Sequence, residues 1–147
     1  MSLNNLVGRT LEKITPDRTS IIRILTAAER NIADSKIKQI SAENRFDAAY
    51  KAIMQLVNAA LQASGYRTLT SVPGHHQTMI QSLAKTAGVE KDTIVILDKM
   101  RKQRNVADYS GDVIPESTTK ECIRQAELLM KKVTDWLSKN HPELINE

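Results

Sequence analysis

Apolar residues recur at intervals of three and four along most of this chain, which is the period of amphipathic helices. The clearest pattern begins after Ser41 and ends before Ser64 and Gly65, a pair typical of a helix C-terminus. Its apolar stripe consists of Phe46, Ala49, Tyr50, Ile53, Val57, Ala60 and Leu61. The sequence therefore predicts a long helix here, with one face turned to a core.

The N-terminal region predicts two more helices. A short amphipathic segment covers about 3–14. A longer helix covers about 16–40, with Thr15 as its N-terminal cap and Pro16 in its first turn, where proline needs no hydrogen-bond donor. Charged residues separate the apolar positions of this longer helix, as expected when one face is exposed.

Three further helices are predicted in the second half of the chain. The loop GYRTLTSVPG contains glycine and proline, and it precedes a helix over about 75–87 that Gly88 ends. Another helix begins at about 92, and a Thr-x-x-Glu capping box at Thr118 opens the last one, which continues to about Asn140. Together these elements predict an all-α protein: an up-and-down bundle of four to five helices with a short extra N-terminal helix.

Length and composition narrow this picture. The 147 residues are expected to form a single domain, 1–147, whose core covers about 16–140. The one cysteine, Cys122, cannot form a disulfide within the chain, so it is expected to be buried in a reducing compartment, the cytoplasm. No apolar run approaches the ~20 residues of a membrane span, so no membrane association is expected.

The charge permits an anionic partner without requiring one, because Lys and Arg number 21 against 17 Asp and Glu. Aromatic residues make up only 3% of the chain, which disfavours a platform that stacks single-stranded bases. The sequence contains no Gly-rich phosphate loop and no Cys-x-x-Cys pair, and we expect neither a cofactor nor a metal. Any nucleic-acid role must therefore rest on a local site.

Arg104 occupies an apolar face of its helix. At about 100° per residue, Arg101, Arg104 and Asp108 lie on the side that faces the core. A guanidinium there must be paired or must open onto a cleft, because burying it alone is costly. One interpretation is structural, with Arg104 paired to Asp108 and Arg101 paired to Asp98. The other is functional, and the spacing alone leaves both open.

The residues from Arg104 to Tyr109, RNVADY, resemble the signature of the HEPN superfamily, in which an Arg, usually followed by Asn, precedes a His by four to six residues. The segment GYRTLTSVPGHHQTMIQSL, 65–83, is similar to the Gly-His-His segment of one bacterial and archaeal branch. With the flanking helices, the resemblance covers about 46–137. It implies a helical bundle that forms a homodimer, with the two Arg-containing motifs in a cleft at the interface.

The resemblance also implies a range of activities. Active members cut RNA without a metal, with the Arg stabilising phosphate and the His assisting proton transfer at the 2′-hydroxyl. Others bind nucleotides or are partners of a small nucleotidyltransferase, often in toxin-antitoxin or phage-defence modules. Arginine suits the phosphate role because its planar fork can grip two oxygen atoms.

This chain departs from the signature, because Tyr109 stands where the His is usual. A phenol with a pKa near 10 is a poor general base at neutral pH, although it can donate a hydrogen bond to phosphate. Asp108 is expected to orient Arg104 rather than to move a proton. Side chains five apart on a helix point about 140° apart, so Arg104 and Tyr109 share a site only if the helix ends between them, as Ser110 and Gly111 would allow.

Two adjacent histidines, His75 and His76, lie at the predicted start of a helix. In one interpretation, one ring caps or packs against the loop and the other is solvated. In the other, one histidine reaches the Arg104 cleft and supplies the proton-transfer group that Tyr109 does not. The two alternatives stay open at this point.

These considerations give two sets of candidate residues. Candidates for catalysis are Arg104, Tyr109, Asp108 and His76, and candidates for ligand contacts are Arg101, Asn105, His75, Arg67 and Tyr66. The last two either line the cleft or lie elsewhere, with Tyr66 packed over the bundle end and Arg67 in solvent. The first functional hypothesis is a homodimeric bundle that binds RNA or a nucleotide, with ribonuclease activity left open. The alternative is a non-catalytic interaction module, such as a partner of a nucleotidyltransferase.

Overall fold

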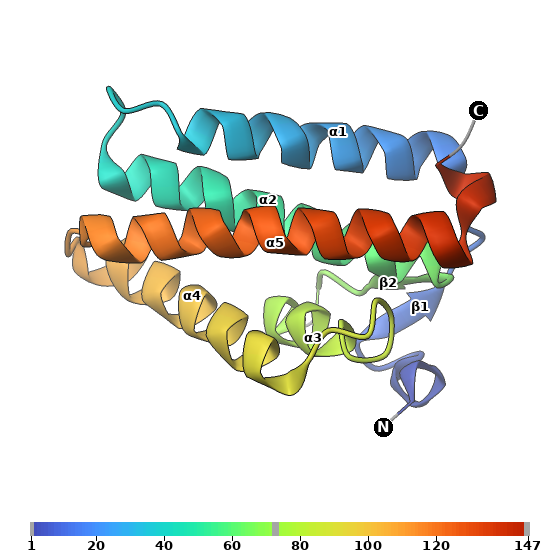
Figure 1. Cartoon of the computed structure of the whole chain (residues 1–147). Coiled ribbons are helices and arrows are strands. Elements are labelled where there is room, and N and C mark those ends of the chain that lie inside the picture. The colour runs from blue at the N-terminus through green and yellow to red at the C-terminus, as the bar shows by residue number, and fades with distance from the viewer. Residues whose placement is uncertain (1, 72–73, 146–147) are drawn as a thin grey trace.

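The computed structural model describes residues 2–71 and 74–145, and it confirms the predicted all-α class (Figure 1). Val72 and Pro73 of the predicted loop lie outside the described residues. The helices are α1 (Arg18–Ser35), α2 (Ala42–Ala63), α3 (His75–Ser82), α4 (Lys91–Ser110) and α5 (Glu116–Asn140). Two short strands, β1 (Leu11–Lys13) and β2 (Tyr66–Thr68), pair antiparallel, and 3₁₀ helices cover Leu3–Leu6 and Pro142–Leu144. Within the described part of the chain, no helix is both long enough and apolar enough to cross a membrane.

Helix α2 is the centre of the bundle. It contacts α1, α3, α4 and α5, and twelve of its 22 residues are buried. Ser41 caps its first turn by accepting a hydrogen bond from the Asn44 backbone N–H at 3.3 Å, as a serine before a helix usually does. The strong apolar stripe seen in the sequence therefore marks the element around which the others pack (Figure 1).

The prediction of an N-terminal helix over 3–14 is wrong. Gly8 adopts a φ of +85°, a left-handed conformation that interrupts helical geometry, and β1 follows as an extended strand. Leu11 is paired with Thr68 and fully buried, in a small cluster with Leu3 and Leu61. The apolar residues of this segment thus pack against the end of α2, and Leu11 does so from a two-stranded ribbon and not from a helix.

The helix predicted over 16–40 is shorter at both ends. Asp17, rather than Thr15, caps α1, because its carboxylate accepts a hydrogen bond from the Ser20 backbone N–H at 3.3 Å. The helix ends at Ser35, and Ile37 and Ile40 are exposed in the turn that follows. The apolar periodicity overstated the helix because residues in a turn can fall in register with it by chance.

Two boundaries in the second half also differ from expectation. Helix α3 ends at Ser82 and is followed by turns, so the predicted helix to residue 87 is too long. Helix α5 begins at Glu116 without a side-chain cap, so the predicted capping box at Thr118 is wrong. Its acidic member, Glu121, instead accepts hydrogen bonds from Arg124 and Gln125.

Helix α4 is the most exposed of the long helices. Only Leu97 and Met100 are buried among its 20 residues. Figure 1 shows α4 and α5 close together at the loop that joins them and farther apart toward the start of α4, while α1, α2 and α5 lie side by side. The side of α4 that faces α2 and α3 is the part of the bundle where polar residues meet.

Candidate functional site

Arg104 lies on the side of α4 that faces α2. Its Nε atom is 3.8 Å from Oδ1 of Asp47 and 3.9 Å from Oδ2 of Asp108. Its guanidinium carbon lies 5.2 Å from the centre of the Tyr50 ring, a cation-π distance. The side chain keeps 36% of its surface exposed, so it is not buried, and at 3.8 and 3.9 Å neither carboxylate is within hydrogen-bond distance of it. Its charge is shared between two carboxylates and remains available at the surface.

Tyr50 links α2 to the second histidine of α3. Its hydroxyl oxygen is 3.2 Å from Nδ1 of His76, and the two ring centres are 6.0 Å apart. Burial raises the pKa of Tyr50 to about 12, although the positive charge of Arg104 opposes this, so the phenol is protonated at neutral pH. A buried tyrosine at the edge of the core needs such a hydrogen-bond partner, and His76 supplies it.

His76 is neutral at physiological pH. Burial lowers its pKa below 6.5, and the neighbouring His75, Arg104 and Arg101 lower it further because each disfavours a second positive charge. The hydrogen bond to Tyr50 occupies the Nδ1 atom of the His76 ring. If Nδ1 donates to the phenol oxygen, Nε2 has a free lone pair and can accept a proton; if Nδ1 accepts, Nε2 carries the hydrogen and can donate it.

Side chains from α2, α3 and α4 surround a groove of about 430 Å³. The lining residues are Asp47, Tyr50, Lys51, Met54, Gln55, Asn58, His76, Met79 and Arg104. Two cations and one carboxylate are present, and burial raises the pKa of Asp47 while Arg104 lowers it. The groove is hereafter called the Arg104 groove. Its size falls within the usual range for small-molecule sites.

The structure brings some of the predicted site residues together. Arg104 and His76 both line the Arg104 groove, Asp108 is within reach of Arg104, and the ring of His75 meets that of His76 edge-on at 4.7 Å. Arg101 is paired with Asp98 at 2.8 Å, as the sequence predicts, and this hydrogen bond lowers the pKa of Asp98. Arg101 acts on the groove through its charge and does not line it.

Other predicted residues lie elsewhere. Helix α4 continues through Ser110, so Tyr109 does not turn back toward Arg104, and its side chain is 93% exposed. Asn105 is also exposed, and with Val106, Tyr109 and Ser110 it borders a shallow hollow near the end of α4. Tyr66 donates a hydrogen bond to Asn4, and Arg67 pairs with Glu12 across the ribbon of β1 and β2. Of the two interpretations of Tyr66 and Arg67, the one in which they line the cleft is wrong, because neither lines the Arg104 groove.

Sequence reasoning missed the contribution of α2. The sequence pattern places Tyr50 on the apolar stripe of the core, and it does not single out Asp47 or Lys51. A signal was available, because a tyrosine on a buried stripe has a hydroxyl that must find a partner. The identity of that partner, 26 residues further along the chain, depends on how α3 packs against α2.

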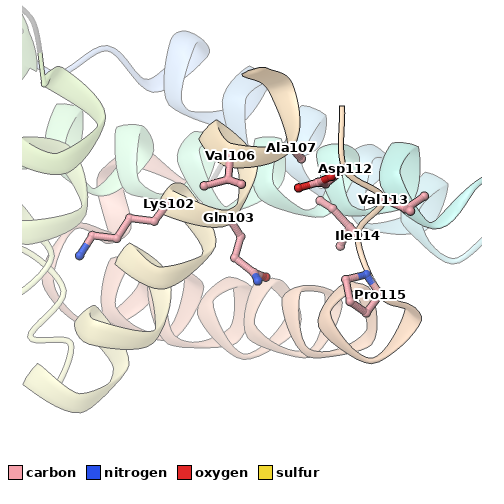
Figure 2. Close-up of a pocket in the computed structure, with 8 residues that line it drawn as sticks. All are labelled: Lys102, Gln103, Val106, Ala107, Asp112, Val113, Ile114 and Pro115. Atoms are coloured by element: carbon pink, nitrogen blue, oxygen red, sulfur yellow. The ribbon is translucent and has the colours of Figure 1, made fainter. Parts of the chain in front are cut away.

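A second hollow, of about 310 Å³, lies beneath the last turns of α4 (Figure 2). It is bordered by Lys102, Gln103, Val106 and Ala107 of α4 and by the loop residues Asp112, Val113, Ile114 and Pro115. Figure 2 shows these side chains around the loop that leads into α5. No histidine or arginine lines this hollow, and its one cation, Lys102, is accompanied by the carboxylate of Asp112, so it lacks the pairing of arginine and histidine found in the Arg104 groove.

Neither comparison with known proteins identifies a relative. No family model matches the chain, and no curated protein matches it. Among residues 2–71 and 74–145, no group of three or more His, Cys, Asp and Glu side chains could hold a metal ion.

Protonation of His76 is expected to destabilise the fold. Its pKa is lower in the folded state than in the unfolded chain, so the unfolded chain binds the proton more readily. Stability should therefore fall as the pH drops below about 6.5, and His76 should contribute no pH dependence well above that value. Urea unfolding of His76→Asn should vary less between about pH 7 and about pH 5 than that of the wild type. His141→Asn, at the other end of the bundle, is the control; an unchanged profile in His76→Asn would contradict the prediction.

Proposed function

We propose that the Arg104 groove binds a phosphate group of RNA or of a nucleotide. The proposal rests on one observation: an arginine that is not fully paired and a neutral histidine line the same groove. Arg104 supplies positive charge with donors suited to two phosphate oxygens. Lys51 of α2 adds a second positive charge to the groove. The helical bundle and the RNVADY motif also support membership of the HEPN superfamily, which we propose together with a cytoplasmic location.

The same groups support metal-independent cleavage of RNA. His76 Nε2 would take the proton from a 2′-hydroxyl, and the resulting oxygen would attack the adjacent phosphorus. A 2′,3′-cyclic phosphate would form as the bond to the 5′-oxygen breaks, and that oxygen would leave as a hydroxyl after gaining a proton from solvent. Arg104 would stabilise the charge on the phosphate oxygens as the bonds change. In this scheme His76 takes the role that the superfamily signature gives to the position of Tyr109.

The test is incubation of the metal-free protein with a mixed set of single-stranded and structured RNAs. Cleavage by the wild type should be lost in Arg104→Ala and in His76→Ala, each shown to be folded by circular dichroism. Arg23→Ala and His141→Ala remove the same side chains away from the groove and should cleave normally. If the wild type binds RNA in an Arg104-dependent way but cuts none, the groove is a binding site only. Absence of both binding and cleavage would overturn the proposal.

An exposed apolar surface supports a second proposal, that the chain forms a homodimer. Val106, Tyr109 and Val113 are 58%, 93% and 76% exposed near the C-terminal end of α4. A tyrosine and two valines so exposed gain free energy when a partner covers them. In such a dimer, Asn105 and Tyr109 contact the partner subunit rather than Arg104 of their own chain. The same surface would serve a different protein, such as a nucleotidyltransferase, if the chain is an interaction module in a toxin-antitoxin system.

A charge placed on this surface should weaken the dimer. Val106→Asp is expected to raise the dimer dissociation constant by about tenfold or more, because the carboxylate would be desolvated at the interface. Sedimentation equilibrium of wild type and variant measures this change. Val95→Asp introduces the same charge at a 53% exposed valine in the first half of α4 and is the control. A monomeric wild type at high concentration would contradict the homodimer and favour a different partner.

A further inference from the structure

We propose that the Arg104 groove also selects the base of a bound nucleotide, and that it prefers guanine and uracil to adenine and cytosine. This inference rests on the proposed function, because a phosphate must first be held at Arg104. It concerns the other end of the groove, where Gln55 and Asn58 lie. The two amides are the groups that would contact a base edge.

The groove has a charged end and an amide end. Asp47, Tyr50 and Lys51 are followed along α2 by Gln55 and Asn58, and all five line the groove. At 1.5 Å per residue, Tyr50 and Asn58 are about 12 Å apart along the helix axis. Arg104 and His76 lie at the Tyr50 end, because both contact that residue. This separation is comparable to the distance from the phosphate of a nucleotide to the outer edge of its base.

Between these ends, two methionines provide an apolar surface. Met54 of α2 and Met79 of α3 line the groove and keep 8% and 7% of their surface exposed. The thioether of methionine makes favourable contacts with aromatic rings and adapts to their shape. A base can therefore lie against the two methionines with its edge toward the amides.

Hydrogen bonds within the protein decide which atoms the amides offer. Asn31 Nδ2 donates to Oε1 of Gln55 at 2.8 Å, and Gln62 Nε2 donates to Oδ1 of Asn58 at 3.3 Å. Neither Asn31 nor Gln62 lines the groove. Each carbonyl oxygen thus already accepts one hydrogen bond from a residue outside the groove. The hydrogen bonds of the described residues leave the NH₂ groups of Gln55 and Asn58 without partners, so these two amides present donors.

Two donors match bases that carry acceptors at the edge. Guanine offers O6 and N7, and uracil, like thymine, offers O4. Adenine and cytosine instead carry the amino groups N6 and N4 where guanine and uracil carry O6 and O4, so at least one amide NH₂ group would face another donor, although adenine keeps N7 as an acceptor. A polar group left without its partner in a confined site costs free energy, so adenine and cytosine should bind less well.

The experiment is isothermal titration calorimetry with the four nucleoside 3′-monophosphates and with inorganic phosphate. We expect the guanine and uracil nucleotides to bind about fivefold more tightly than those of adenine and cytosine, the size expected for one net hydrogen bond. The double variant Gln55→Glu, Asn58→Asp replaces each NH₂ group by an oxygen of nearly the same size. It should weaken binding of all four nucleotides through its charge but reverse the preference toward adenine and cytosine. Gln81→Glu, the same change on an exposed residue of α3 outside the groove, should keep the original preference.

The outcomes separate this inference from the proposed function. Equal binding of the four nucleotides, lost in Arg104→Ala, would overturn base selection and leave phosphate binding intact. A preference for adenine and cytosine in the wild type would overturn the assigned amide orientation. A guanine and uracil preference that survives in the double variant would show that other groups read the base, and would overturn the roles of Gln55 and Asn58. No binding of any nucleotide or of phosphate would overturn both proposals.

Discussion

Arg104→Ala is expected to lower the affinity of the groove for a nucleotide phosphate by about tenfold to a hundredfold. A hydrogen bond to a charged group contributes about 1.5–3 kcal/mol, which corresponds to about tenfold to a hundredfold in affinity. Its guanidinium is only partly neutralised by Asp47 and Asp108, at 3.8 and 3.9 Å, so a phosphate need not displace a close ion pair. Titration calorimetry with a nucleoside monophosphate measures the change.

Two further variants separate the contribution of the planar guanidinium from that of its positive charge. Arg104→Lys should retain part of the affinity, because the ammonium keeps the charge but loses the planar fork. Arg23→Ala removes an exposed arginine from α1 and controls for net charge. The thermal stability of Arg104→Ala should change little, because the side chain is 36% exposed and its ion pairs are long. Wild-type affinity in Arg104→Ala would place the phosphate elsewhere.

Phe46→Ala is expected to lower the free energy of unfolding by about 3–5 kcal/mol. Phe46 is fully buried in α2, and its ring is stacked on that of Tyr50, with centres 6.4 Å apart. Truncation removes apolar contacts and leaves a cavity beneath the residue that orients His76. Urea unfolding measures the loss.

A matched control distinguishes burial from residue type. Val95→Ala shortens an apolar side chain that is 53% exposed on α4 and should change stability by less than about 0.5 kcal/mol. At temperatures where Phe46→Ala remains folded, its nucleotide affinity should also fall, because Tyr50 loses a packing partner. A loss below about 1 kcal/mol would mean that the site collapses around the smaller side chain and that Phe46 does not hold Tyr50 in place.

The N-terminal segment shows where sequence patterns are ambiguous. Leu3, Val7 and Leu11 recur every four residues, like one face of a helix, yet Leu3 belongs to a 3₁₀ helix and Leu11 to a strand. The strand exists because β2, more than fifty residues later, provides its hydrogen-bonding partner through Leu11 and Thr68. A short segment takes its conformation from such partners, since a helix of this length is marginal alone.

The sequence likewise predicts one residue of the candidate site correctly and misplaces another. Arg104 was identified because a charged residue on an apolar face costs free energy unless it is paired or opens onto a cleft. That argument needs only the helical period. Tyr109 was assigned to the same site on the condition that the helix ends between them, and α4 continues through both. Local signals at Ser110 and Gly111 placed the helix end only to within one turn, which is enough to move a side chain to the other face.

The sequence by itself determined the helical class, the central helix α2 and the unusual position of Arg104, because each follows from residues within a few turns of one another. Only the tertiary structure decided that Tyr50, His76 and Arg104, from three different helices, meet at one groove. Helix periodicity states which face is buried but not which neighbour covers it. That choice depends on how α3 and α4 pack on α2, and so on the summed packing of the whole core.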